Sequence, residues 1–134
     1  MPPSRSQPEF FVDRSLARRD VAEALRREGW LVRTHLEVFG ERDQDVTDVE
    51  WLELCGREGW VVLTMDRRIR YRRAEIAAIR RHRVQAFVLT SGNLTAAQQA
   101  QRFAHNAARI AAACDVAGPF VYVVHPKRIA RIYP

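Results

Sequence analysis

Short apolar runs alternate with amphipathic segments along the chain, and this alternation predicts its secondary structure. We expect strands at residues 9–13, 30–34, 60–64, 84–90 and 119–124, with 129–132 as a candidate edge strand. Helices are expected at 16–28, 49–58, 73–83 and 95–113. Strands that are apolar on both faces and alternate with helices indicate a sheet covered on both sides. The predicted fold class is α/β, a three-layer α/β/α sandwich with a central, mostly parallel sheet.

Several local signals set the expected element boundaries. Gly29 and Gly59 end the first two helices, and Thr47 with Glu50 three residues later makes a capping box before the second. The polar segment 35–46, which contains Gly40, is expected to be a loop. The alanine-rich helix 95–113 is expected to pack on the sheet, with a subunit interface as the alternative, and His105 and Asn106 are expected to face solvent or that interface.

Length and composition indicate one domain. The 134 residues suit a single core, and no apolar run approaches the about 20 residues of a membrane span. Residues 1–8 have no apolar stretch of the kind found in secretory signals, and we expect a disordered arm there, followed by a single domain over 9–134. Cys55 and Cys114 belong to no metal-binding spacing and are expected to be buried thiols, which favours a cytoplasmic protein without a membrane partner.

The charge is strongly basic, with a formal net value of +6, and Lys127 is the only lysine. Arginine has a planar fork that suits phosphate, and a basic domain tends to associate with polyanions. Compositional bias would explain the ratio of arginine to lysine but not the clustering of the arginines. The predicted nucleic-acid-binding residues, which include one tyrosine that could stack on an unpaired base, are Arg14, Arg67, Arg68, Arg70, Tyr71, Arg72 and Arg73.

Three acids fall where the strands of a parallel sheet would end, the usual place for ligands in such sheets. Asp13 closes the first strand, Asp66 follows the third, and Asp48 begins the helix that leads into the third. Close carboxylates repel one another unless a cation lies between them, and oxygen ligands favour Mg²⁺ or Mn²⁺. Such an ion can activate water for attack on a phosphodiester. We therefore expect these three acids to be the catalytic and metal-binding set, with Glu37, Asp45 and Glu50 as second-rank ligands.

These motifs resemble a known family. The segments Phe-Phe-Val-Asp13-Arg-Ser-Leu, Thr-Asp48-Val-Glu-Trp-Leu and Val-Val-Leu-Thr-Met-Asp66-Arg-Arg-Ile are similar to those of the PIN-domain superfamily. The chain looks most like its short PIN-like branch of VapC-type toxins from bacterial toxin–antitoxin pairs, over roughly residues 10–93.

That resemblance implies a Mg²⁺-dependent endoribonuclease that is inhibited by a co-encoded antitoxin protein and is commonly a homodimer. Asp13, Asp48 and Asp66 match the acidic positions of the family. Longer members also carry an acid on a helix between the first two of these, whereas in this chain that region is the expected loop that contains Glu37. Ser91 and Asn93, after the fourth strand, are candidates to position water or phosphate, although turn formation would explain them equally well.

Two other readings compete with the nuclease. A phosphoacceptor receiver-like signalling domain has a similar fold, and Asp13, Asp66, Thr90 and Lys127 mimic its pattern, but its second acid at the first strand is missing. The other alternative is a non-catalytic RNA-binding PIN-like module that has kept the fold without the chemistry. Metal-dependent cleavage of RNA would separate the nuclease from both.

Overall fold

The computed structural model describes residues 7–16, 18–90 and 92–134. The expected N-terminal arm therefore lies outside the described residues except for Gln7 and Pro8, and Ser91 also lies outside them. In the described part of the chain, no helix has the length and apolar character needed to cross a membrane.

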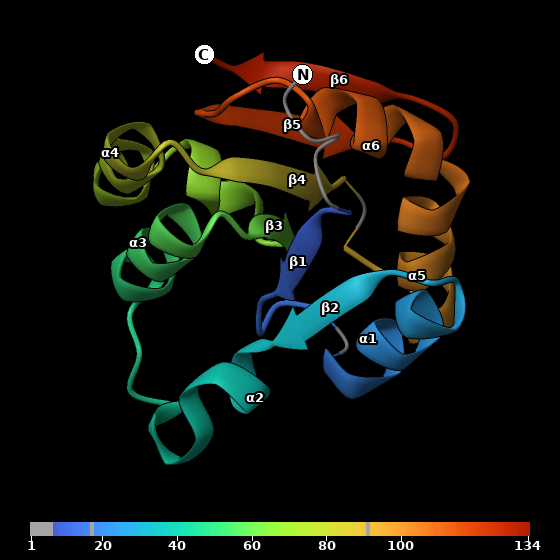
Figure 1. Ribbon diagram of the computed structural model, residues 1–134, viewed down its shortest axis with the longest axis horizontal. Coiled ribbons are helices and arrows are strands. Elements are labelled where there is room, and N and C mark those ends of the chain that lie inside the picture. The colour runs from blue at the N-terminus through green and yellow to red at the C-terminus, as the bar shows by residue number, and fades with distance from the viewer. Residues whose placement is uncertain (1–6, 17, 91) are drawn as a thin grey trace, which may run out of the picture.

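Over the described residues, six strands and six α-helices, with two short 3-10 turns, follow one another in nearly the expected order (Figure 1). The strands are β1 (Glu9–Val12), β2 (Leu31–Thr34), β3 (Val61–Thr64), β4 (Gln85–Leu89), β5 (Phe120–Val124) and β6 (Ile129–Tyr133). The helices are α1 (Arg18–Arg27), α2 (His35–Phe39), α3 (Asp48–Glu58), α4 (Arg73–His82), α5 (Ala96–His105) and α6 (Ala107–Cys114). The 3-10 turns are η1 (Gly40–Arg42) and η2 (Arg67–Arg70).

The strands form one sheet in the order β2-β1-β3-β4-β5-β6. The first five strands of that order are parallel, and β6 pairs antiparallel with β5 at the edge. The sheet is thus mostly parallel, as the apolar runs predicted, and 129–132 is confirmed as part of an edge strand.

Helices cover both faces of the sheet and make the sandwich that the sequence predicted (Figure 1). On one face, α1, α5 and α6 bury Leu25, Phe103 and Ile110 against the sheet. On the other, α3 and α4 bury Leu52 and Ile79 in a second cluster. The packing of segment 95–113 on the sheet is therefore confirmed.

The segment 35–46, expected to be a loop, instead contains α2 and η1. Thr34 is the N-cap of α2, and the Glu37 backbone N–H donates to its hydroxyl at 3.1 Å. The Glu37 carboxylate accepts from the Thr34 N–H at 2.8 Å, which completes a capping box. The expectation was wrong because this helix starts directly at the end of β2, without the polar spacer that normally announces a new element.

The segment 95–113, expected to be one helix, is divided at Asn106 into α5 and α6. His105 is exposed as expected, but Asn106 is fully buried, so its predicted exposure was wrong. The Asn106 side-chain amide donates to the Arg102 carbonyl at 2.9 Å and to the His125 carbonyl, at the end of β5, at 2.8 Å. These bonds tie the helix break to the sheet, which explains why a polar residue lies inside the core.

Candidate active site

Asp13 and the segment ending at Asp66 lie where neighbouring strands leave the sheet in opposite directions. β1 pairs with β3 in register, Val12 opposite Leu63, and the Asp13 N–H donates to the Leu63 carbonyl at 3.2 Å. After β1 the chain enters α1 on one face, whereas after β3 it enters η2 and α4 on the other. Such a divergence opens a crevice at the carboxyl ends of the strands. The ends of β1 and β3, with Asp13 and Asp66 after them, therefore lie side by side.

Asp13 is a buried carboxyl with only 4% of its surface exposed. Its Oδ1 accepts from the Ser15 N–H at 2.7 Å and from the Ser15 hydroxyl, and its Oδ2 accepts from the Thr64 hydroxyl at 2.5 Å. Burial, with a smaller contribution from the charge of Asp66, raises the pKa of Asp13 to about 6 against the opposing effect of its three hydrogen bonds. The groups that donate these hydrogen bonds to Asp13 are uncharged, so dipoles rather than a cation stabilise the ionised carboxylate.

Two hydroxyl side chains, Ser15 and Thr64, join the ends of β1 and β3. Their oxygens lie 3.1 Å apart. The Ser15 hydroxyl also accepts from the Met65 N–H at 2.8 Å, and the Thr64 hydroxyl accepts from the Asp66 N–H at 3.1 Å. Asp13 and the backbone of Asp66 are thus linked through one buried hydroxyl. The sequence reasoning did not identify Ser15 or Thr64, although an Asp two residues before a Ser is a common turn pattern.

Asp66 is the N-cap of η2 and is more open than Asp13, with 21% of its side chain exposed. Its Oδ1 accepts from the Arg68 N–H at 3.0 Å and from the Arg68 Nε–H at 3.1 Å. Both contacts use the same carboxylate oxygen. The cap explains why the chain turns here, and it leaves the Asp66 side chain partly exposed.

Asp48 points to other partners. Its Oδ1 accepts from the Trp51 indole N–H at 2.9 Å, and its Oδ2 forms an ion pair with the Arg72 guanidinium at 3.6 Å. Among the described residues, no group of three or more Asp, Glu, His or Cys side chains is placed to hold a metal ion. The structure therefore brings Asp13 and Asp66 together, but does not complete the predicted three-acid group with Asp48.

The second-rank acids have structural roles or face water. The Glu37 carboxylate caps α2 and pairs with Arg26 at 2.7 Å. Glu50 completes the predicted capping box with Thr47. It also pairs with Arg42 at 3.1 Å. Asp45 is exposed.

The predicted nucleic-acid-binding residues differ in exposure, because the Arg14 side chain is half-buried whereas most of the others are exposed. Arg14 donates through its guanidinium to the Asp43 carbonyl at 2.9 Å and to the Val46 carbonyl at 3.2 Å, which holds the segment before α3. Asp43 is buried, and its carboxylate lies 2.6 Å from the His35 ring. The exposed residues beside the crevice, in η2 and at the start of α4, are Arg67, Arg68, Tyr71, Arg72 and Arg73, with Arg70 in the same turn.

The remaining predicted residues are less informative. Asn93 is exposed in the turn between β4 and α5. Cys55 and Cys114 are buried as expected. Burial, with a smaller contribution from the nearby Asp13 charge, raises the pKa of the Cys55 thiol.

The α/β/α sandwich with Asp13 and Asp66 at the ends of β1 and β3 is matched by a known protein family. The profile of the family described as PIN-like domain matches residues 8–91. The chain belongs to this family.

A curated relative extends the match beyond the profile. A protein of Mycobacterium tuberculosis (strain H37Rv) named "Putative ribonuclease VapC45" is 34% identical over 124 residues, which cover 92% of this chain and 90% of that protein. No solved structure matches the chain. The resemblance inferred from the three acidic motifs is thus confirmed, and family membership decides against the receiver-like alternative.

Proposed function

We propose that this protein is a Mg²⁺- or Mn²⁺-dependent endoribonuclease and the toxin of a type II toxin–antitoxin pair. The observation that carries the proposal is the buried Asp13 carboxyl, which lies at the end of β1, is linked through Thr64 to Asp66, and has its pKa raised to about 6 by burial and by the charge of Asp66. A buried carboxyl beside a second acid, in the crevice of a parallel sheet, is typical of a functional site. The name of the relative in M. tuberculosis supports the same activity.

The donor set suits a hard divalent cation. Mg²⁺ commonly binds through one or two carboxylates, with water and phosphate oxygens in the remaining positions. Asp13 and Asp66 supply such oxygens, and a cation between them would favour ionised Asp13 and oppose the rise in its pKa. When bound, the ion would supply Lewis-acid chemistry at the phosphodiester. Asp48 is proposed as a further ligand, for which its carboxylate must exchange the contacts with Arg72 and Trp51.

The other residues of the site orient the Asp13 carboxylate and bind the RNA. Ser15 and Thr64 hold both Asp13 oxygens, so that the carboxylate has a single orientation before substrate arrives. The exposed arginines of η2 and α4 would bind phosphates of single-stranded RNA, which contribute affinity without sequence preference. Tyr71 would stack on an unpaired base.

Cleavage of RNA by the purified full chain tests the activity. We expect cleavage in Mg²⁺ that EDTA abolishes and that leaves 5′-phosphate and 3′-hydroxyl ends. Asp66→Asn should lose cleavage and keep the fold, while Asp115→Asn, an exposed acid after α6, serves as the matched control. Full activity of Asp66→Asn would remove Asp66 from the site. RNA binding without cleavage would instead favour the non-catalytic alternative, which the separate contacts of Asp48 also favour.

The toxin role needs a separate test, because nuclease activity alone does not establish it. Induced expression should stop bacterial growth, Asp66→Asn should not, and the protein encoded by the neighbouring gene should restore growth and bind the purified chain. Sedimentation of the free chain would test the expected homodimer. We place the protein in the cytoplasm, where its RNA substrate and its antitoxin would be.

A further inference from the structure

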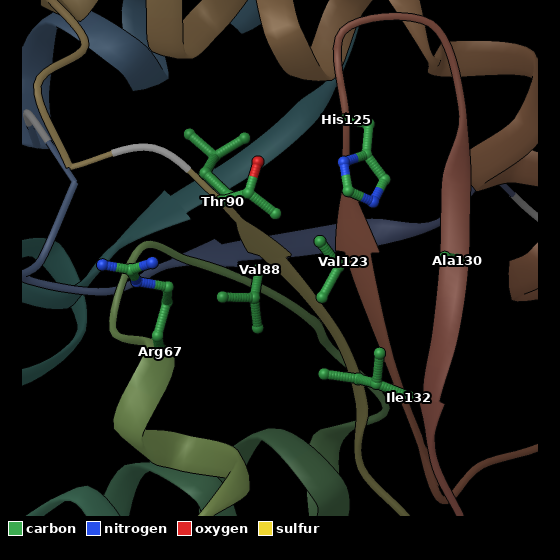
Figure 2. Close-up of a pocket in the computed structure, with 8 residues that line it drawn as sticks. Arg67, Val88, Thr90, Val123, His125, Ala130 and Ile132 are labelled. Carbon is green, nitrogen blue, oxygen red and sulfur yellow. The ribbon is translucent and has the colours of Figure 1, made fainter.

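A pocket of about 230 Å³ lies beyond the acidic crevice, over β4, β5 and β6 (Figure 2). Its floor is apolar and is built from Val88, Val123, Ala130 and Ile132. Polar groups stand at its rim: Arg67 extends from η2 on one side, and Thr90 and His125 lie at the ends of β4 and β5 on the other (Figure 2).

The pocket floor includes residues that are in register, strand by strand, with Thr64, the residue that donates to Asp13. Thr64, which donates to Asp13, is in register with Val88, Val88 with Val123, and Val123 with Ala130. Residues in register on adjacent strands lie about 5 Å apart, so Val88 and Val123 are about 5 and 10 Å along the sheet from Thr64. Arg67 directly follows Asp66 in the chain. The pocket is therefore adjacent to the candidate active site and shares its sheet edge.

The polar rim offers hydrogen bonds at fixed positions. The backbone N–H of His125 donates to the Arg128 carbonyl at 2.8 Å, and the His125 carbonyl accepts from the Asn106 side chain. The backbone of His125 is therefore anchored. Burial, followed by the charges of Arg128 and Arg102, lowers the pKa of His125. A neutral imidazole has one donor and one acceptor nitrogen. The Thr90 hydroxyl donates to the Val124 carbonyl only across 3.5 Å, a long contact that a closer acceptor can replace.

We propose that this pocket binds one unstacked nucleobase of the RNA substrate and thereby sets the base preference of cleavage beside Asp13 and Asp66. The inference rests on the proposed ribonuclease function and names a specificity site for it. An apolar floor with a few polar groups at the rim is how proteins take a splayed base, whose face is apolar and whose edge is polar. Arg67 would hold the phosphate of the same nucleotide.

The size of the pocket and the positive charge beside it favour a nucleobase of RNA as the occupant. Its volume is below the about 300–1,000 Å³ of pockets that take drug-sized ligands, so it suits one planar ring system. Arg67 at the rim, with the exposed Arg68 next to it in η2, favours a polyanion. An acidic segment of a protein partner is the other occupant that such charges would attract, and the experiment below separates the two.

Binding of mononucleotides to the full chain in EDTA tests the pocket without requiring catalysis. The four ribonucleoside 5′-monophosphates are titrated into isotopically labelled protein, with ribose 5-phosphate as the probe that lacks a base. We expect at least one nucleotide to shift the NMR signals of Val88, Val123 and Ala130, and ribose 5-phosphate to leave Val123 and Ala130 unchanged. Signals that respond equally to ribose 5-phosphate would overturn the proposal.

A second experiment fills the pocket with a larger side chain. Ala130→Phe, or Ala130→Leu if the larger residue impairs folding, should weaken nucleotide binding by about tenfold or more. Ala108→Phe, on the exposed side of α6, is the matched control and should bind as the unmodified chain does. In RNA cleavage, the Ala130 variants should lose base preference at the cut site.

The outcomes separate this inference from the proposed function. Base-dependent binding in a chain that cuts no RNA would leave the pocket standing and remove the nuclease. Cleavage with unchanged base preference in the Ala130 variants would leave the nuclease and refute the pocket. If these variants instead bind nucleotides normally but escape inhibition by the neighbouring gene product, the pocket serves a protein partner and the inference is wrong.

Discussion

Replacement of Asp13 by Asn should stabilise the protein at neutral pH in the absence of divalent ions. Burial raises the pKa of Asp13 from its ordinary value of 3.8 to about 6 in the folded chain. At 1.36 kcal/mol per pH unit, the ionised carboxylate lowers the free energy of unfolding by about 3 kcal/mol above the folded pKa. Asp13 is buried, so solvent screening does not reduce this value appreciably.

The direction with pH follows from the raised pKa. Between about pH 4 and 6 the folded chain binds this proton more tightly than the unfolded chain, so stability is greatest below pH 4 and is lost as pH rises through 6. The amide introduced by Asp13→Asn carries no charge and escapes that loss. It must still face Thr64, whose hydroxyl donates to Asp13 in the native protein, and this mismatch offsets part of the gain. We expect a net stabilisation of about 1–3 kcal/mol at pH 8.

Urea denaturation in EDTA at pH 4, 6 and 8 measures the effect. The difference in free energy of unfolding between Asp13→Asn and the unmodified chain should change by about 2 kcal/mol in favour of the variant from pH 4 to pH 8. Asp115→Asn, at an exposed carboxyl, is the control and should show a far smaller change. A variant that is destabilised by the same amount at all three pH values would show that Asp13 serves as a structural hydrogen-bond acceptor and that its ionisation is not costly.

Three other perturbations test the metal site, the packing of α3 on α4 and the helix break. Mg²⁺ should raise the melting temperature more at pH 8 than at pH 5 in a thermal scan, because protons compete for Asp13, and an equal rise would argue against a site there. Gly56→Ala should destabilise by about 1–3 kcal/mol in urea, since its Cβ would lie 2.4 Å from the His82 carbonyl oxygen, whereas Gly92→Ala meets nothing within 4 Å and should be nearly neutral. Asn106→Leu should destabilise by about 1–3 kcal/mol because the part-buried carbonyls of Arg102 and His125 lose the hydrogen bonds from the Asn106 amide, and a neutral result would mean that water replaces the amide.

Local signals were enough for most of the fold. The apolar run 60–64 and the capping box of Thr47 and Glu50 predicted β3 and the start of α3, because each depends on residues close in sequence. The same capping pattern stands at Thr34 and Glu37, but it overlaps the end of a strand and was not recognised. The division at Asn106 depends on a bond to His125 in β5, which local periodicity cannot reveal.

The candidate site was predictable only in part. Asp13 and Asp66 follow adjacent parallel strands, so their proximity follows from topology once the strands are placed. The orientation of Asp48 depends on Arg72, 24 positions further along the chain, and on the way α3 packs beside α4. The pocket near Arg67 depends on the register of β4, β5 and β6, which no local pattern specifies.

The close approach at Gly56 has a consequence for the timescale of events around Asp48. Two contacts, one between Gly56 and His82 near the ends of α3 and α4 and one between Asp48 and Arg72 at their beginnings, bind the two helices side by side along their length. Such close packing of the two backbones opposes sliding of one helix past the other. Redirecting Asp48 is then a matter of side-chain torsions, which take picoseconds to nanoseconds, and needs none of the microsecond-to-millisecond shifts of whole elements.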